Sequence, residues 1–309
     1  MEGNKRLKHI ISAEQFDREI LENLFDITDR TEIRISRIGG DHFLLGRVLA
    51  YIFYEPSTRT RLSFESAMLR LGGNVIGTDN AAHLSSAAKG EALEDAIRVV
   101  GGYSDIIVLR HSSIDSAERA AAVSAVPVIN AGNGSGEHPT QALLDLYTIR
   151  RKLNKIDGIN IAIVGDLKYG RTVHSLSRSL VNFEGVSMTF ISPEQLQLDA
   201  DTKTYLDKNN VDYRQVQDLK EACGADVVYQ TRIQKERFSD PELYREVKGK
   251  YVIDDKFASS MRSGAIIMHP GPRVEEITRD VDRTDKAVYF EQSHYGLPVR
   301  MALIKLLLS

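Results

Sequence analysis

The run of residues 56–61, Pro-Ser-Thr-Arg-Thr-Arg, combines hydroxyl groups and two guanidinium groups at the start of a predicted helix. Residues 48–54 before it form an apolar run typical of a buried strand, and residues 62–71 carry apolar side chains at helical spacing. At such a strand-to-helix turn, unpaired backbone N–H groups and the positive end of the helix dipole favour an anion. A plain helix cap with surface arginines is the alternative. Two arginines beside one cap favour a phosphate-sized anion.

Two further strand ends carry polar side chains that could serve the same ligand. Arg110 follows the predicted strand 105–109, and His138 and Gln141 follow a glycine-rich loop after the predicted strand 126–129. His138 can donate a hydrogen bond to a carbonyl oxygen, and Gln141, one turn later, offers a donor and an acceptor. Taken singly, Arg110 is better explained as an exposed strand-end arginine, and a capping role explains His138 as well as a ligand role does.

The second half of the chain has three comparable loops. Residues 165–172 resemble a nucleotide-binding P-loop but carry Arg171 in place of lysine; arginine suits a carboxylate or a single phosphate, so nucleotide hydrolysis is disfavoured. Residues 231–237 follow a predicted strand, and alternation places Arg232 and Gln234 on one side. Residues 269–273 form a rigid turn with two prolines. Each could be an ordinary solvated loop, but together the polar strand ends favour a ligand site.

Apolar runs alternate with helical patterns along the chain, which is the signature of parallel α/β sheets. The predicted strands are 48–54, 105–109, 126–129, 159–164, 188–191, 226–229 and 265–268. A predicted helix over 138–152 precedes a domain boundary. We expect an α/β protein of two domains, 1–152 and 153–297, each a mostly parallel sheet flanked by helices, with the active site in the cleft between them. An apolar C-terminal helix, 298–309, is expected to pack back on the first domain.

Composition excludes several classes of function. The net charge of −3 argues against a nucleic-acid partner, because such proteins carry a basic face. One cysteine, Cys223, rules out an internal disulfide and is interpreted as structural, and no Cys/His group has zinc-site spacing. No signal-peptide pattern and no membrane-spanning apolar run is present, so we expect a cytoplasmic protein without a membrane partner.

These motifs resemble the catalytic chains of the aspartate carbamoyltransferase family over essentially the whole length. The matching segments are residues 57–61, 138–141, 165–172, 231–237 and 269–273. The first two are shared with ornithine carbamoyltransferases and imply carbamoyl phosphate as the donor, whereas the later ones select the acceptor.

The resemblance assigns roles around carbamoyl phosphate. Its phosphate would lie on Ser57, Thr58, Arg59, Thr60 and Arg110. Its carbonyl oxygen would be polarised by the catalytic set of Thr60, Arg110 and His138, donors aimed where charge develops. Its amino group would be held by Gln141 and the backbone carbonyls of Pro270 and Gly271. No metal and no cofactor is expected.

The resemblance also implies a homotrimer in which a loop of the neighbouring subunit, carrying Ser85 and Lys89, completes each active site. A separate regulatory chain is a further partner that the resemblance allows. The sequence departs from the family pattern at three positions: Gly271 stands where leucine or alanine is common, Ala88 where some members have a second lysine, and Tyr295 where asparagine is common. These changes are expected to loosen the turn and weaken phosphate binding.

The acceptor is expected to be L-aspartate. Its two carboxylates need two cations, which Arg171 and Arg232 supply, with Gln234 as an added donor and Thr172 beside Arg171. Ornithine would need an acidic partner and would bring a His-Cys-Leu-Pro turn, where this chain has His-Pro-Gly-Pro at 269–272. The implied products are N-carbamoyl-L-aspartate and phosphate, in the committed step of pyrimidine synthesis. A non-catalytic relative that binds a phosphorylated metabolite is the competing class, and the completeness of the site argues against it.

Overall fold

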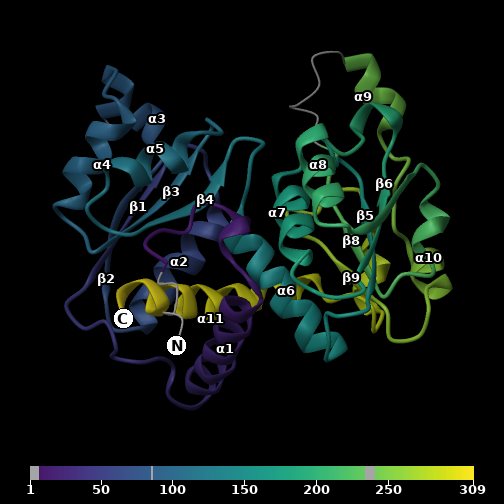
Figure 1. Cartoon of the computed structure of the whole chain (residues 1–309), viewed down its shortest axis with the longest axis horizontal. Helices are drawn as coiled ribbons and strands as arrows, with labels where there is room; N and C mark the ends of the chain where they lie inside the picture. The colour runs from purple at the N-terminus through teal and green to yellow at the C-terminus, as the bar shows by residue number, and fades with distance from the viewer. Residues whose placement is uncertain (1–6, 85, 234–240) are drawn as a thin grey trace. The chain divides into compact units, whose positions relative to one another are not determined.

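The computed structural model describes residues 7–84, 86–233 and 241–309. The chain divides into two compact units: unit 1 is Met1–Leu143 with Tyr295–Ser309, and unit 2 is Leu144–His294. Each unit is a parallel sheet with helices packed on it (Figure 1), so the predicted α/β class is confirmed. The limits of the functional domains, 1–152 and 153–297, stay a prediction.

Unit 1 contains a four-stranded parallel sheet in the order β2-β1-β3-β4. Its strands are β1 (Val48–Phe53), β2 (Asn74–Asp79), β3 (Ile106–His111) and β4 (Val128–Asn133). Its helices are α1 (Arg18–Ile38), α2 (Thr58–Arg70), α3 (Ala81–Leu84), α4 (Leu93–Gly101) and α5 (Ser116–Val123), with short 3₁₀ helices η1 (Ala13–Gln15) and η2 (Ser86–Lys89).

The core of unit 1 follows from the alternation of side chains along its central strands. Ala50 and Ile52 of β1 pack with Ile97 of α4, and the residues between them face the opposite side of the sheet, where Phe64 and Met68 of α2 are fully buried. Strands buried on both faces must be apolar at nearly every position, which is why β1 and β3 are recognisable in the sequence.

Unit 2 contains a five-stranded parallel sheet in the order β7-β6-β5-β8-β9. Its strands are β5 (Asn160–Val164), β6 (Ser187–Ile191), β7 (Asp212–Val216), β8 (Val227–Gln230) and β9 (Ile266–Met268). Its helices are α7 (Arg171–Leu180), α8 (Ala200–Lys208), α9 (Pro241–Val247) and α10 (Asp255–Ser260), with 3₁₀ helices η3 (Glu194–Leu196), η4 (Leu219–Ala222) and η6 (Arg279–Arg283).

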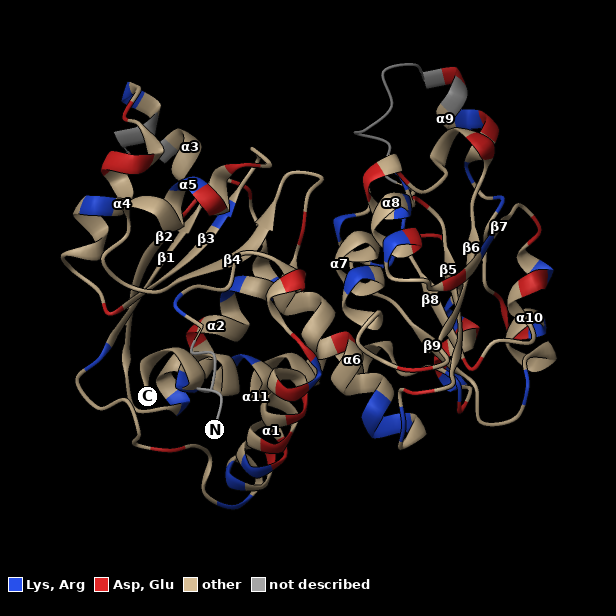
Figure 2. Cartoon of the chain, viewed as in Figure 1, with Lys and Arg blue, Asp and Glu red and all other residues tan. Residues whose placement is uncertain are grey.

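Two helices belong to both units. Helix α6 (Pro139–Leu153) changes unit after Leu143, and α11 (Tyr289–Leu308) changes unit after His294. The last turn of α6 gathers Arg150, Arg151 and Lys152 (Figure 2), where positive charge complements the negative end of the helix dipole. No helix in the described part of the chain is long and apolar enough to cross a membrane.

The last helix is longer than the sequence indicates. Pro298 is typical of a first helical turn, so the sequence predicts a start there, but α11 begins at Tyr289 and carries Pro298 in its interior. The C-terminal part is anchored in unit 1, where Lys305 Nζ lies 2.9 Å from Asp41 Oδ2.

This anchor predicts a pH dependence of stability. Burial would raise the pKa of Asp41, but hydrogen bonds from Lys305 and Arg34 lower it from the ordinary 3.8 to about 2. A depressed carboxylate pKa stabilises the fold above pH 4, and the effect is lost as the pH falls towards 2. Because the pair is partly exposed, we expect Asp41→Asn to cost about 1 kcal/mol at pH 7. Urea denaturation should show this difference shrinking between pH 4 and 2.5; a pH-independent difference would contradict the assignment.

Candidate active site

The turn between β1 and α2 holds the predicted anion site. Ser57 is the N-cap of α2, with extended backbone at φ −156°, but its side chain caps no N–H of the first turn. Instead Ser57 Oγ donates to Thr60 Oγ1 over 3.0 Å. The capping alternative therefore does not explain Ser57, and the amides of the first turn are not covered by its hydroxyl. Thr58 is exposed and Thr60 is buried.

The two arginines of this motif have different environments. Arg61 Nη1 lies 2.6 Å from Asp79 Oδ2, and the Arg61 guanidinium lies 5.9 Å from the ring centre of Tyr51. Arg59 is exposed, burial of part of its side chain lowers its pKa, and no carboxylate of the described chain raises it. Arg61 is thus held by protein carboxylates, whereas the charge of Arg59 is available to an anionic ligand.

Arg110 lies at the same sheet edge because of the strand register. Phe53 of β1 pairs with Arg110 of β3, and the Tyr54 N–H donates to the Arg110 carbonyl oxygen over 2.8 Å. The Arg110 side chain is mostly buried; its Nη1 donates to the Ala131 carbonyl oxygen over 3.1 Å, and its Nη2 lies 3.8 Å from a Glu55 oxygen. These contacts fix the guanidinium beside the β1–α2 turn.

His138 and Gln141 are placed by the loop after β4. Both are buried, and the Gln141 N–H donates to the His138 carbonyl oxygen over 2.9 Å at the start of α6. His138 Nδ1 lies 3.4 Å from Thr140 Oγ1. Parallel pairing of β3 with β4 brings this loop to the edge that carries Arg110.

A polar network that the sequence analysis missed holds this glycine-rich loop. Asn133 Oδ1 accepts the Glu137 N–H over 2.7 Å, and the buried Glu137 carboxyl accepts hydrogen bonds from Ser12 Oγ (2.9 Å) and the Ala13 N–H (2.6 Å). Ile10 pairs in parallel with Ile129 of β4. The Ser-x-x-Gln spacing at residues 12–15 is a capping signal, but nothing in the sequence connects it to a loop 125 residues away.

In unit 2 the Arg171 loop is fixed against the end of β8. Gly165 has φ +116°, and a side chain there would meet the Thr231 carbonyl oxygen at 2.4 Å, so only glycine fits. The Asp166 N–H donates to Thr231 Oγ1 over 3.1 Å, and Thr231 Oγ1 donates to the Val164 carbonyl oxygen over 2.9 Å. Because Arg232 follows Thr231, the loops of Arg171 and Arg232 lie at adjacent strand ends.

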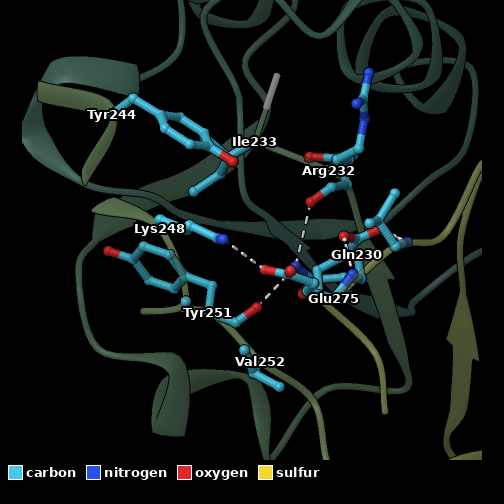
Figure 3. Close-up of a pocket in the computed structure, with 12 residues that line it drawn as sticks. Gln230, Arg232, Ile233, Tyr244, Lys248, Tyr251, Val252 and Glu275 are labelled. Atoms are coloured by element: carbon cyan, nitrogen blue, oxygen red, sulfur yellow. Dashed lines mark hydrogen bonds and ion pairs between the residues drawn. The ribbon is translucent and has the colours of Figure 1, made fainter. Parts of the chain in front are cut away.

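A cavity of about 130 Å³ lies next to Arg232. Figure 3 shows Gln230 donating to the Tyr251 carbonyl oxygen (3.1 Å) and Lys248 paired with Glu275 (3.3 Å), while the side chain of Arg232 points away from that pair. Gln230 and Lys248, two polar residues that line the cavity, are therefore bonded to other lining residues, and the Arg232 guanidinium points away from the Lys248–Glu275 pair.

The turn after β9 carries Pro270 and Gly271. The Gly271 N–H donates to His269 Nδ1 over 2.7 Å, and His269 Nε2 lies 2.8 Å from Glu276 Oε1. Gly271 has φ +71°, a conformation that leucine or alanine would adopt only with strain. The departure from the family pattern at this position therefore suits the local backbone.

Of the remaining predicted positions, Thr172 lies beside Arg171 and is half-buried in the first turn of α7, whereas Lys89 is exposed at the end of η2. Ser85 and Gln234 lie outside the described residues. Within the described ranges, no group of three or more His, Cys, Asp or Glu side chains could hold a metal ion.

Cationic and hydroxyl-bearing loops at the carboxyl ends of two parallel sheets define a two-unit α/β protein built to bind small anionic molecules. The chain belongs to the aspartate/ornithine carbamoyltransferase family: the model of the carbamoyl-P binding domain matches residues 8–151, and that of the Asp/Orn binding domain matches residues 157–307. The resemblance identified from the motifs is confirmed.

Named relatives agree over nearly the full length. The chain is 52% identical to aspartate carbamoyltransferase 3, chloroplastic, of Pisum sativum, over 99% of this chain and 79% of the relative. It is 52% identical to the aspartate carbamoyltransferase catalytic subunit of Methanocaldococcus jannaschii, over 98% of both chains. The crystal structure of aspartate transcarbamoylase from Trypanosoma cruzi, in complex with carbamoyl phosphate and aspartate, superposes with a TM-score of 0.92 at 39% identity, covering 98% of this chain and 97% of that one.

The contrast between the two arginines predicts different effects of their removal. We expect Arg59→Ala to weaken binding of inorganic phosphate at least about tenfold, because it deletes a charge-assisted contact, without lowering the melting temperature. Arg61→Ala is the matched control, which should cost some stability and leave phosphate affinity within about threefold. Calorimetric titration with phosphate measures both, and equal losses from the two variants would contradict the assignment.

Proposed function

We propose that this protein is the catalytic chain of an aspartate carbamoyltransferase, which transfers the carbamoyl group of carbamoyl phosphate to the α-amine of L-aspartate. One observation carries the choice within the family: two arginine loops, those of Arg171 and Arg232, lie at adjacent strand ends and are tied together through Thr231. Two cations suit an acceptor with two carboxylates. In the Trypanosoma cruzi relative, crystals also contain carbamoyl aspartate and phosphate.

Carbamoyl phosphate would bind at the β1–α2 turn and Arg110. The amides of the first turn of α2, the hydroxyls of Ser57 and Thr60, and the Arg59 guanidinium would hold the phosphate. Arg110 is already fixed by the Ala131 carbonyl, so it loses little freedom on binding. Gln141 and the carbonyls of Pro270 and Gly271 would hold the carbamoyl amino group.

The proposed chemistry is nucleophilic attack on a polarised carbonyl. The α-amine nitrogen forms a bond to the carbamoyl carbon, the bond from that carbon to the phosphate oxygen breaks, and the departing phosphate takes the amine proton. Thr60, Arg110 and His138 would donate to the carbonyl oxygen as it gains negative charge. Holding the two substrates in line supplies a large further part of the acceleration.

We also propose that the protein assembles as a homotrimer. A homotrimer would let Ser85 and Lys89 of a neighbouring subunit reach the phosphate, and the exposed position of Lys89 supports a role outside its own subunit's core. A regulatory chain would be an additional partner. Cytoplasmic localisation stays a prediction.

The acceptor assignment is tested by assaying purified protein with carbamoyl phosphate and either L-aspartate or L-ornithine, following phosphate release and the carbamoylated product. We expect turnover with aspartate alone, because a site with two arginines repels the ornithine side-chain ammonium. Turnover with ornithine, or with neither acceptor, would overturn the proposal.

A single substitution then separates the two substrate sites. Arg232→Ala should raise the KM for aspartate at least about tenfold, the loss that one charge-assisted hydrogen bond of 1.5–3 kcal/mol corresponds to, and change the KM for carbamoyl phosphate much less. Arg214→Ala, which removes an exposed arginine paired with Glu221 on the same unit, is the control and should leave both constants unchanged. Equal rises in both constants for Arg232→Ala would refute its role in acceptor binding.

A further inference from the structure

Asp145 is a fully buried carboxyl group on α6 that the proposed chemistry does not use. Both of its oxygens accept hydrogen bonds: Oδ2 from the Tyr229 hydroxyl over 2.7 Å, and Oδ1 from Gln292 Nε2 over 2.7 Å. A buried carboxyl group is costly unless its oxygens are satisfied, so its retention calls for a reason. Its two partners lead to different loops of unit 2.

The first arm, the hydrogen bonds that start at Asp145 Oδ2, leads to the loop of Arg171 and Thr172, the acceptor loop. Tyr229 is fully buried on β8, two residues before Thr231, and its hydroxyl also forms a hydrogen bond with the side chain of Thr172. Burial, together with the neighbouring Asp145, raises the pKa of Tyr229 well above its ordinary value, so the hydroxyl keeps its proton and remains a donor. Thr172 follows Arg171 directly, so this arm fixes the first turn of α7 at the predicted aspartate-binding residue.

The second arm, the hydrogen bonds that start at Asp145 Oδ1, leads to the turn after β9. Gln292 lies on α11 with 1% of its surface exposed, and its Oε1 accepts the His269 N–H over 2.8 Å. His269 Nδ1 in turn accepts the Gly271 N–H, so Nε2 carries the ring proton and donates to Glu276. Burial would raise the pKa of Glu276, but the hydrogen bond from His269 lowers it overall, which keeps Glu276 an acceptor. This arm shapes the backbone whose carbonyls are predicted to contact carbamoyl phosphate.

We propose that Asp145 is a positioning residue. Through its two oxygens it fixes the position of the acceptor loop at Arg171–Thr172 relative to the donor turn at Pro270–Gly271. The inference rests on the proposed function, because that function assigns one substrate to each loop. Because one carboxyl group is hydrogen-bonded towards both loops, the two substrate positions depend on a single side chain of α6.

The arms are separable by substitution. Tyr229→Phe removes one hydroxyl and leaves the second arm intact, so the KM for aspartate should rise about fivefold, the change that one net hydrogen bond corresponds to, and that for carbamoyl phosphate should change less than about twofold. Gln292→Met breaks the other arm and should show the reverse pattern. Asp145→Asn has only one acceptor oxygen, so at least one of the two constants should rise.

Thr148→Val on the same helix is the matched control. Thr148 is fully buried, and its hydroxyl donates to the Leu144 carbonyl oxygen over 2.7 Å. Loss of this hydrogen bond should lower the melting temperature without changing either KM. Hydrogen–deuterium exchange of the segment 269–273 gives a readout independent of activity: it should accelerate in Gln292→Met but not in Tyr229→Phe or Thr148→Val.

The outcomes distinguish this inference from the function on which it rests. Failure of the unmodified protein to carbamoylate aspartate would overturn the function. An active protein in which Tyr229→Phe leaves both constants unchanged, or raises both equally, would overturn the inference alone, as would equal effects from Thr148→Val. If Asp145→Asn does not fold, Tyr229→Phe, which removes one oxygen atom, still decides the question.

Discussion

The parallel pairing of strands is the constraint on which the candidate site depends. In a parallel sheet every strand ends at the same edge, so residues distant in sequence meet there without any contact designed between them. The pairing of Phe53 with Arg110 shows this directly, because the next backbone hydrogen bond, from Tyr54 to the Arg110 carbonyl, fixes where the predicted anion-binding turn leaves the sheet. In unit 2 the pairing of β5 with β8 does the same for the two arginine loops.

Near the carboxyl ends of the strands, the partners of each polar side chain decide whether that side chain is structural or available to a ligand. Arg61 is paired with Asp79, Lys248 with Glu275 and His269 with Glu276, so these side chains have partners within the protein. Arg59 stands apart because no carboxylate of the described chain raises its pKa. Buried polar groups such as Glu137 and Asp145 form a third set, which shape the loops and have all their named partners within one unit.

The sequence predicts the fold class and most strands because central parallel strands are apolar on both faces. It misses β2 and β7, which lie at sheet edges and alternate between exposed and half-buried positions, so they lack an apolar run. It predicts Ser57, Arg110, His138 and Arg171 as candidate site residues because cations and hydroxyls at strand ends have a local pattern. It cannot identify Ser12 with Glu137, or Asp145 with Gln292, because those pairs are 125 and 147 residues apart and no local signal links their members.

The attachment of the N-terminal segment to β4 also constrains the order of folding. Ile10, Ser12 and Ala13 are synthesised before their partners, because Ile129 on β4 and Glu137 follow more than a hundred residues later. Closing so long a loop is entropically costly until β1, β3 and β4 have already assembled. We therefore expect residues 10–13 to become fixed only after these strands have paired, and the loop that carries His138 to reach its final shape when they dock.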